Sequence, residues 1–369
     1  MTVFSSKYTI ELWTRAGTLL ADLGTKPRNR VLVQSRNEPD DLSFDMDLVE
    51  FERYCDRAGV DPKELLIVNS VEVRIKRHRK YLSGGQLVYR NVSITANENT
   101  LTCRVFGFLQ LFAKRYTGES TAGLVSDVYS TSDGTADLSR KDLAWALINQ
   151  SQNLANGSFG ITIGPNQAGN TTTYQKNYSR TNIKDALQGL TTVEAGAIDI
   201  EFTHDKKFNT YDYMGSDRPD IVFEYPGNIT SIDVPEDGTD MTNEAIGIGR
   251  GAADGTQTIA VEADLASQAQ YRLRQDTINS NGTDNSDGGI TDDAKAEIQS
   301  ASLPLRVPSL VVDGNFAPFV TDYGIGDRVR VKVSGYKLVD NINGMYRIER
   351  RTIRIDENDN EEVILEVSG

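Results

Sequence analysis

Two segments of the chain alternate apolar and charged residues with a period of two. They are VEVRIKR, residues 71–77, and DRVRVKV, residues 327–333. Successive side chains of a β-strand point to opposite faces, so each segment predicts a strand with one apolar face and one charged face. Such strands are typical of antiparallel sheets that pack one face on a core and leave the other face in water.

The rest of the first 110 residues carries the same signal, and so do the last 65. Short alternating runs read RVLVQSR and LSFDMDL near the start, and MYRIERRTIRID and EEVILEVSG near the end. Turn-forming groups such as NEPDD and NENT separate the early runs, and the pair Gly84-Gly85 permits a tight hairpin turn. We therefore expect a meander of half-buried strands, in a small barrel or sandwich, followed much later by a second β region.

The middle of the chain changes to helical spacing. In TADLSRKDLAWALINQSQN, Ser139 stands at an N-cap position and Asp142 follows three residues later, as in a capping box. SRTNIKDALQGLTTVEAG predicts a second short helix with Asn182 as its cap. Residues 278–290 are rich in Gly, Asn, Asp and Ser and predict an exposed loop, followed by a helix with Thr291 as its N-cap.

The chain is acidic, and this limits the partners that it can bind. It has 53 Asp and Glu residues against 39 Lys and Arg residues, a formal net charge of −14 and a pI near 4.8. Phosphate contacts need positive faces, so this balance argues against a general DNA- or RNA-binding protein. We find no apolar run of the roughly 18 residues that a membrane span needs. The N-terminus has no signal-peptide pattern, so we expect assembly in a cytoplasm.

Few residues suit catalysis or metal binding. Cys55 and Cys103 have no CxxC spacing and are expected to be free, buried thiols. His78 and His204 are the only histidines and lie in no HExxH pattern, which excludes a zincin. The glycine-rich GIGRGAADG does not match a phosphate-binding loop, and no GxSxG elbow is present. We therefore predict no enzyme and no catalytic, cofactor-binding or metal-binding residue.

Two chemical alternatives remain open at this point. Acid pairs in DLSFDMDL and IDIEF would serve a glycoside hydrolase only if two carboxylates converged in a cleft, and no pair stands out. DNSDGG resembles part of a calcium loop but lacks the glutamate at the twelfth position, so a polar loop is favoured.

Several segments, taken in order, resemble the hub proteins of phage tails. They are VEVRIKRHRKYLSGG, LTCRVFGFLQLFAKR, SRKDLAWALINQ, YSRTNIKDALQGLTTVEAGAIDIEF, FNTYDYMG, ITSIDVPEDGTDMTNEAIGIGRG, SQAQYRLRQDTI and the closing GIGDRVRVKV to MYRIERRTIRID. Their order and the total length carry the resemblance, rather than one sharp motif. The chain resembles minor tail proteins of long-tailed actinobacterial phages, which are similar to the contractile-phage baseplate hub and the N-terminal part of siphophage tail-associated proteins.

The resemblance implies an α+β, mostly β fold with two small β-barrel-like hub domains and α+β insertions. The N-terminal barrel would span residues 1–115, and an α+β insertion would span 116–205. A second barrel would combine residues 206–250 with 305–369, and residues 251–304 would form a helix and loop insertion.

The same resemblance implies a structural protein of the virion that forms a homotrimer. In the hub family, two barrel domains per subunit form a six-fold-like ring, which joins a hexameric tail end to three-fold tip proteins. The implied partners are a distal tail protein or tail tube ring and other tail-tip proteins, with DNA passing transiently through the lumen. The net charge suggests an acidic lumen that lets DNA pass without sticking.

Other functions also remain open. Family members with enzymatic activity carry it in C-terminal extensions, and this chain ends at Gly369, so we expect no lytic activity. The alternatives are a cell-wall-degrading tail enzyme, such as a glycoside hydrolase, and a receptor-binding tip module with exposed aromatic clusters.

Basic residues of the alternating segments form the candidate interface. They are Arg74, Lys76, Arg77, Arg79, Arg328, Arg330 and Lys332. The stretch VRIKRHRK lacks the interleaved aromatic residues of a single-strand-binding surface, and we interpret it as a strand end that leads to the Gly84-Gly85 turn. Its expected partner is a carboxylate face of another protein, such as a neighbouring subunit; DNA contact is the alternative.

Overall fold

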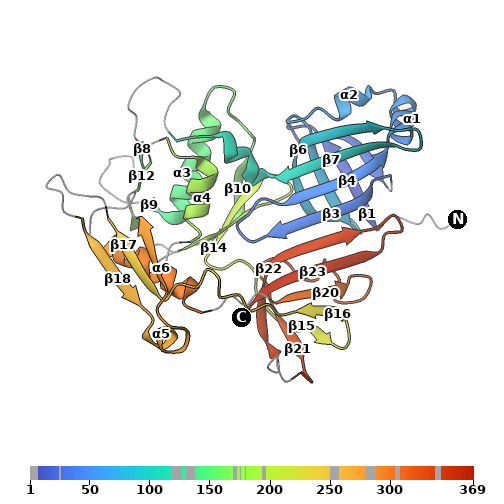
Figure 1. The fold of residues 1–369 in the computed structure, drawn as a ribbon. Helices are drawn as coiled ribbons and strands as arrows, with labels where there is room; N and C mark the ends of the chain where they lie inside the picture. The colour runs from blue at the N-terminus through green and yellow to red at the C-terminus, as the bar shows by residue number, and fades with distance from the viewer. Residues whose placement is uncertain are drawn as a thin grey trace. The chain divides into compact units, whose positions relative to one another are not determined.

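The chain forms two compact units in a computed structural model (Figure 1). Unit 1 contains Met1–Thr191, Ile198–Ile232 and Ser309–Gly369, and unit 2 contains Thr192–Ala197 and Asp233–Pro308. The residues described are 7–24, 26–117, 127–129, 138–168, 173–174, 176–178, 180–192, 197–249, 257–279, 287–303, 308–336 and 342–369. Strand residues outnumber helix residues among them, which confirms the α+β, mostly β class.

A thirteen-stranded sheet forms the centre of unit 1. Its N-terminal strands are β1 (Tyr8–Trp13), β2 (Leu19–Gly24), β3 (Arg28–Ser35), β4 (Asp41–Asp47), β5 (Glu72–Arg77), β6 (Lys80–Ile94) and β7 (Asn99–Gly107). Its later strands are β15 (Asp217–Tyr225), β16 (Ile229–Asp233), β20 (Ser309–Asp313), β21 (Arg328–Val333), β22 (Ile342–Ile355) and β23 (Glu361–Ser368). The order is β16-β20-β23-β22-β3-β4-β7-β6-β5-β1-β2, and β21 pairs with both β15 and β22.

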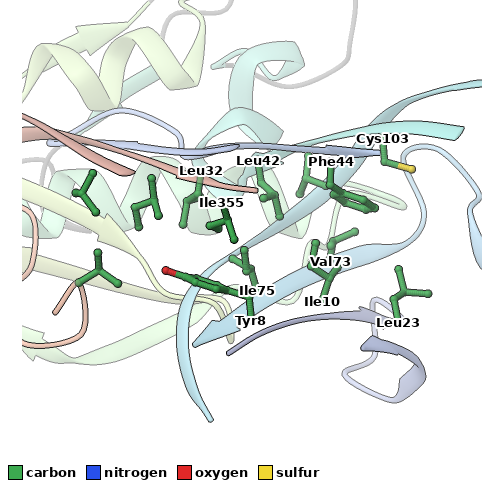
Figure 2. Close-up of a cluster of buried hydrophobic side chains, with 14 of the residues drawn as sticks. Tyr8, Ile10, Leu23, Leu32, Leu42, Phe44, Val73, Ile75, Cys103 and Ile355 are labelled. Carbon is green, nitrogen blue, oxygen red and sulfur yellow. The ribbon is translucent and has the colours of Figure 1, made fainter. Parts of the chain in front are cut away.

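The two β regions expected from the sequence meet in one antiparallel pair, β22 with β3. Its register runs from Arg350 opposite Ser35 to Ile355 opposite Arg30. Figure 2 shows the consequence for packing, because Ile355 of β22 lies in the same buried cluster as Leu32 of β3. Both regions therefore share one continuous sheet and one core. Among the described strands, the first and last strands of the order do not pair with each other, so neither β region closes into a barrel.

The alternating segments form the strands that they predict. Val73 and Ile75 of β5 are fully buried, and Val329, Val331 and Val333 of β21 are buried on one face. The Arg and Lys residues of both strands lie on the opposite faces, apart from Arg77, which continues the buried row of β5.

The hairpin turn between β5 and β6 lies at His78 and Arg79, so the predicted turn at Gly84-Gly85 is wrong. Both turn residues have positive φ, 44° and 74°, as a two-residue type I′ hairpin requires. Gly84 and Gly85 lie inside β6, where space rather than turn geometry selects glycine. A Cβ on Gly85 would lie 2.1 Å from the carbonyl oxygen of Phe106.

Helix α1 (Leu48–Ala58) follows β4, and its buried Phe51 and Cys55 are four residues apart, on one face of the helix. Asp47 caps it by accepting a hydrogen bond from the Glu50 backbone N–H, and Gly59 ends it in the left-handed conformation. Its buried Phe51 and Cys55 face the main core. The short α2 (Pro62–Leu65) begins after Asp61, whose side chain accepts a hydrogen bond from the Lys63 backbone N–H, and Pro62 occupies its first turn.

The insertion after β7 has its own apolar cluster. It contains η1 (Phe108–Lys114), β8 (Asp127–Tyr129), β9 (Leu138–Ser139), α3 (Arg140–Asn153), β10 (Thr162–Gln167), β11 (Thr173–Tyr174), β12 (Lys176–Tyr178), α4 (Ile183–Gly189), β13 (Asp199–Phe202) and β14 (Lys207–Tyr211). The predicted caps Ser139 and Asn182 are confirmed, since each side chain accepts a hydrogen bond from a first-turn N–H. Leu147, Leu187 and Phe208 are fully buried in the cluster.

Unit 2 contains a three-stranded sheet of order β18-β17-β19. Its elements are β17 (Glu244–Ile248), β18 (Ile259–Ala263), α5 (Leu265–Tyr271), β19 (Gln275–Asn279) and α6 (Asp287–Ala301). Helix α6 covers one face of the sheet, and a Cβ on Gly247 would lie 2.7 Å from the Ile290 side chain. The predicted helix is confirmed, but Thr291 is not its cap because the helix begins at Asp287. Residues 280–286 of the predicted loop lie outside the described part of the chain.

Cys55 and Cys103 are free and buried, as predicted. In the part of the chain that the structure describes, none of the helices has the length and apolar character to cross a membrane. The four-part division at residues 115, 205, 250 and 304 stays a prediction.

Candidate functional site

The charged face of β5 is occupied by other parts of unit 1. The turn between β13 and β14 lies against it, and Lys206 in that turn donates to Glu72 of β5 at 2.8 Å. Both side chains are buried, at 7% and 5% exposure. Burial raises the pKa of the Glu72 carboxyl, and the hydrogen bond from Lys206 offsets part of that shift. His204 in the same turn stacks on Tyr81 of β6, with ring centroids 4.1 Å apart.

The cations of β5 have partners within the chain. The guanidinium of Arg74 lies 4.1 Å from the ring centroid of Trp13 on the neighbouring β1. Lys76 forms an ion pair with Glu11, which also accepts a hydrogen bond from the Tyr81 hydroxyl at 2.9 Å. Burial would raise the pKa of Glu11, but the hydrogen bonds from Lys76 and Tyr81 outweigh it, so the pKa lies below its usual value.

Arg77 connects the N-terminal strands to the C-terminal ones. Its Nε donates to Glu361 at the start of β23 at 2.8 Å, and both side chains are almost completely buried. Lys7 forms a second ion pair with the same carboxylate. The Arg77 guanidinium also lies 4.9 Å from the ring centroid of Phe319. Glu361 is thus a buried carboxylate held by two cations from the other end of the chain.

A second set of buried polar residues connects β3 and β22, the pair of strands that joins the two β regions. Arg351 of β22 donates to the carbonyl oxygens of Val320 and Tyr323 at 2.7 and 2.9 Å, and to Gln34 of β3 at 2.7 Å. Gln34 in turn donates to Asp40 at 3.2 Å. The hydrogen bond from Arg351 to Gln34 links residues far apart in the sequence, and it supports the register of the β3–β22 pair.

Asp40 is the titratable group of this buried network. Its carboxylate accepts hydrogen bonds from Ser83 at 2.6 Å and from Gln34. Burial raises its pKa to about 6 from 3.8, against the opposing effect of these hydrogen bonds. Burial also disfavours the charged form of the Arg351 guanidinium, so it lowers the pKa of Arg351. We name the residues Gln34, Asp40, Ser83 and Arg351 with the pair Arg77–Glu361 the buried seam.

The remaining candidate interface residues are exposed. Arg79 lies in the β5–β6 turn. On β21, Arg328 approaches Asp217 of β15 at 3.4 Å and Lys332 approaches Glu224 at 3.9 Å, all with exposed side chains. Arg330 between them donates to the amide oxygen of Asn343 at 3.2 Å. Exposed pairs at these distances are weak and exchange readily with water or with another protein.

A cavity of about 560 Å³ lies beside the seam in unit 1. Its lining includes Asp40, Glu201 and Asp327, and each of these carboxylates accepts hydrogen bonds from neighbouring groups of the chain. Among the described residues, no three His, Cys, Asp or Glu side chains gather as a metal site would require. The cavity therefore presents polar side chains already engaged in holding the fold.

The buried seam was not predicted from the sequence. The alternating pattern does contain a signal for it, because two arginines stand at positions that point inward. Val73 and Ile75 of β5 point inward, and Arg77 is the next residue of that row. On β22, Arg351 likewise occupies an inward position two residues before Ile353. A charged residue on an apolar row indicates a buried polar contact, but it does not identify the partner.

No family model matches the sequence, and no curated protein matches it. Solved structures are similar over almost the whole chain. A tail protein from Neisseria meningitidis MC58 superposes with a TM-score of 0.63 at 10% identity, covering 98% of this chain and 96% of that one. The 43 kDa tail protein of prophage MuSo2 from Shewanella oneidensis gives 0.64 at 11% identity, covering 98% of both chains. Prophage tail protein gp18 from Listeria monocytogenes EGD-e gives 0.57 at 11%, covering 97% and 94%. The chain therefore has the fold of phage tail proteins.

Proposed function

We propose that this chain is the hub of a phage tail tip or baseplate, a structural protein of the virion. Three copies form a ring that joins the end of the tail tube to distal tip proteins and surrounds the DNA channel. The observation that carries this proposal is the fold match along the full length of tail proteins from three different bacteria. The match to the tail protein from Shewanella oneidensis covers 98% of this chain.

The shape of the sheet supports a role in symmetry matching. Each subunit has two β regions joined through β22 and β3, so three subunits would present six such regions to a hexameric tube. The buried seam holds the two regions in one fixed relation, which a ring of defined diameter needs. We place the division into two hub domains and two insertions, at residues 115, 205, 250 and 304, within this proposal.

The mechanism we propose is assembly rather than catalysis. The exposed cations Arg79, Arg328, Arg330 and Lys332 are our candidate contacts to neighbouring subunits or tail proteins. Arg74, Lys76 and Arg77 would act through the fold, since they pair inside the chain. The net charge of −14 supports a lumen that repels DNA and lets it pass. Assembly would take place in the host cytoplasm.

Mass photometry and negative-stain microscopy of the purified full chain test the proposal. The expected result is a trimeric ring. A zymogram with host cell walls serves as the second arm, because a monomer that clears cell wall would contradict the proposal and favour a glycoside hydrolase. Binding of the isolated protein to host cells would favour a receptor-binding module instead.

A further inference from the structure

Three side chains of unit 1 meet beside the start of β1. Lys7, the residue before that strand, donates from Nζ to the amide oxygen of Asn315 at 2.8 Å. The same Nζ forms an ion pair with Glu361 at the start of β23. Asn315 lies in the turn after β20, 308 residues from Lys7 in the sequence. An amine, a carboxamide and a carboxylate in contact are the groups that an amide-forming reaction needs.

The carboxamide of Asn315 is held in one orientation. Its oxygen Oδ1 also accepts a hydrogen bond from the backbone N–H of Glu361 at 3.3 Å, and its nitrogen Nδ2 donates to Asp313 at 2.8 Å. Two donors on Oδ1 draw electron density away from the carbonyl carbon Cγ, which makes Cγ a better electrophile. Asn315 is exposed, so a nitrogen released from Cγ has direct access to water.

The amine and the carboxylate lie deeper in the protein. The side chain of Lys7 is 18% exposed, and that of Glu361 is 0% exposed. The backbone N–H of Lys7 donates to Asp359 at 3.2 Å, which holds the residue in place. A Cβ on Gly314 would lie 2.9 Å from Oε2 of Glu361, so glycine at this position lets the carboxylate lie beside the turn that carries Asn315. A carboxylate within reach of the amine is the base that an amine nucleophile requires.

We propose that Lys7 and Asn315 join in an intramolecular isopeptide bond, with Glu361 as the catalytic base. Glu361 takes a proton from the Lys7 ammonium, and the neutral Nζ attacks Cγ of Asn315. The Nζ–Cγ bond forms, the Cγ–Nδ2 bond breaks, and Glu361 returns the proton to the leaving nitrogen. Nζ gives up two protons in all, and both leave with Nδ2 as ammonium. The reaction therefore needs no oxidant, reductant or cofactor.

The bond would tie the first strand of the N-terminal region to the turn after β20. It would lie beside the Arg77–Glu361 pair of the buried seam and reinforce it covalently. A covalent link between distant residues restricts the unfolded chain, as a disulfide does, so the linked protein should resist unfolding better than an unlinked one. This modification does not depend on the proposed hub function.

Intact-protein mass spectrometry of the denatured full-length chain tests the bond. The parent should be lighter than its sequence by the mass of one ammonia, and a protease digest should contain the Lys7 peptide joined to the Asn315 peptide. Lys7→Arg keeps the positive charge beside Glu361 but removes the nucleophile, and Asn315→Ala removes the electrophile. Both variants should have their full sequence mass.

A third variant tests the role of Glu361. Glu361→Gln keeps the shape of the side chain but cannot accept the proton, so it should form the bond slower by on the order of 100-fold. Circular dichroism establishes that the variant is folded before its mass is followed over time. A folded Glu361→Gln protein that forms the bond as fast as the parent would contradict the assigned role of this carboxylate.

Lys80→Arg is the matched control, because Lys80 donates to the backbone carbonyl oxygen of Thr321 rather than to a side-chain amide. It should lose ammonia like the parent. A folded parent that keeps its full sequence mass after prolonged incubation at neutral pH would overturn the inference. An ammonia loss that persists in Lys7→Arg would also overturn it, since the loss would then come from cyclisation of another Asn or Gln. Neither result bears on the trimeric ring, which mass photometry tests separately.

Discussion

Strands β5 and β21 share one pattern of alternating apolar and charged residues, but their charged faces have opposite environments. On β5 the outward cations Arg74 and Lys76 lie against Trp13 and Glu11 and are mostly buried. Arg77, on the inward row of the same strand, pairs with the buried Glu361. On β21 the cations stay in water beside weak, exposed acids. The same local pattern therefore serves the interior of the subunit in one place and an available surface in the other. Energetically, charge pairs on β5 should matter for folding, and those on β21 should matter for contacts between molecules.

The largest expected effect is at Glu361. Glu361→Ala leaves Arg77 buried without its carboxylate and also removes the ion pair with Lys7. Loss of one partner of a buried pair costs about 3–5 kcal/mol in the free energy of unfolding. The matched change on the β21 side is Glu224→Ala, whose exposed carboxylate lies 3.9 Å from Lys332 and which should cost less than about 1 kcal/mol. Denaturant unfolding of both variants measures the difference; equal losses would contradict the comparison.

A smaller effect is expected where the β13–β14 turn meets β5. Lys206→Met removes the cation that pairs with the buried Glu72, and should lower the free energy of unfolding by about 2–3 kcal/mol. The adjacent Lys207 pairs with Asp205 at the surface, so Lys207→Met is a matched control with a change below about 1 kcal/mol. If both substitutions were equally mild in thermal unfolding, the charged face of β5 would contribute no more than a solvated face.

The last effect in this series depends on pH. The pKa of Asp40 is about 6 in the folded protein, above its ordinary 3.8. Between pH 3.8 and about pH 6, the folded state therefore holds a proton on Asp40 that the unfolded state has released. Stability then falls as pH rises between the two values, by up to about 3 kcal/mol. Asp40→Asn should remove this slope and should be more stable than the parent at pH 7.

The control for the pH experiment is an acid beside β21. Asp217 is exposed and lies 3.4 Å from Arg328, so Asp217→Asn should leave the pH dependence of the parent unchanged. Thermal unfolding at pH 4 to 8 measures all three proteins. A slope that persists in the Asp40→Asn variant would show that another group titrates in the window.

Strand positions and their apolar faces were predictable because a period of two is a local property. VEVRIKR and DRVRVKV each contain the full information for β5 and β21. The helix caps Ser139 and Asn182 were predictable for the same reason, since a cap and the N–H that it accepts from lie within three residues.

Contacts across the sheet were not predictable from one sequence. The local pattern did not show that Arg77 continues the inward row of β5 and pairs with Glu361, 284 residues away. The turn at His78-Arg79 was missed because glycine usually supplies positive φ, and the nearby Gly84-Gly85 attracted the prediction. The role of the seven basic residues between subunits stays a prediction, with the four exposed ones now the better candidates.

The pairing of β3 with β22 has a consequence for synthesis on the ribosome. Gln34 of β3 and Arg351 of β22 are separated by 317 residues. The edge of β3 that pairs with β22 therefore stays unpaired until nearly the whole chain has left the ribosome. At about 5–20 residues per second, the free edge of β3 stays unpaired for tens of seconds. During that time the nascent N-terminal region offers a strand edge to any other nascent copy on the same message. Truncation before β22 would make this exposure permanent, and such fragments should accumulate as aggregates rather than as a folded N-terminal domain.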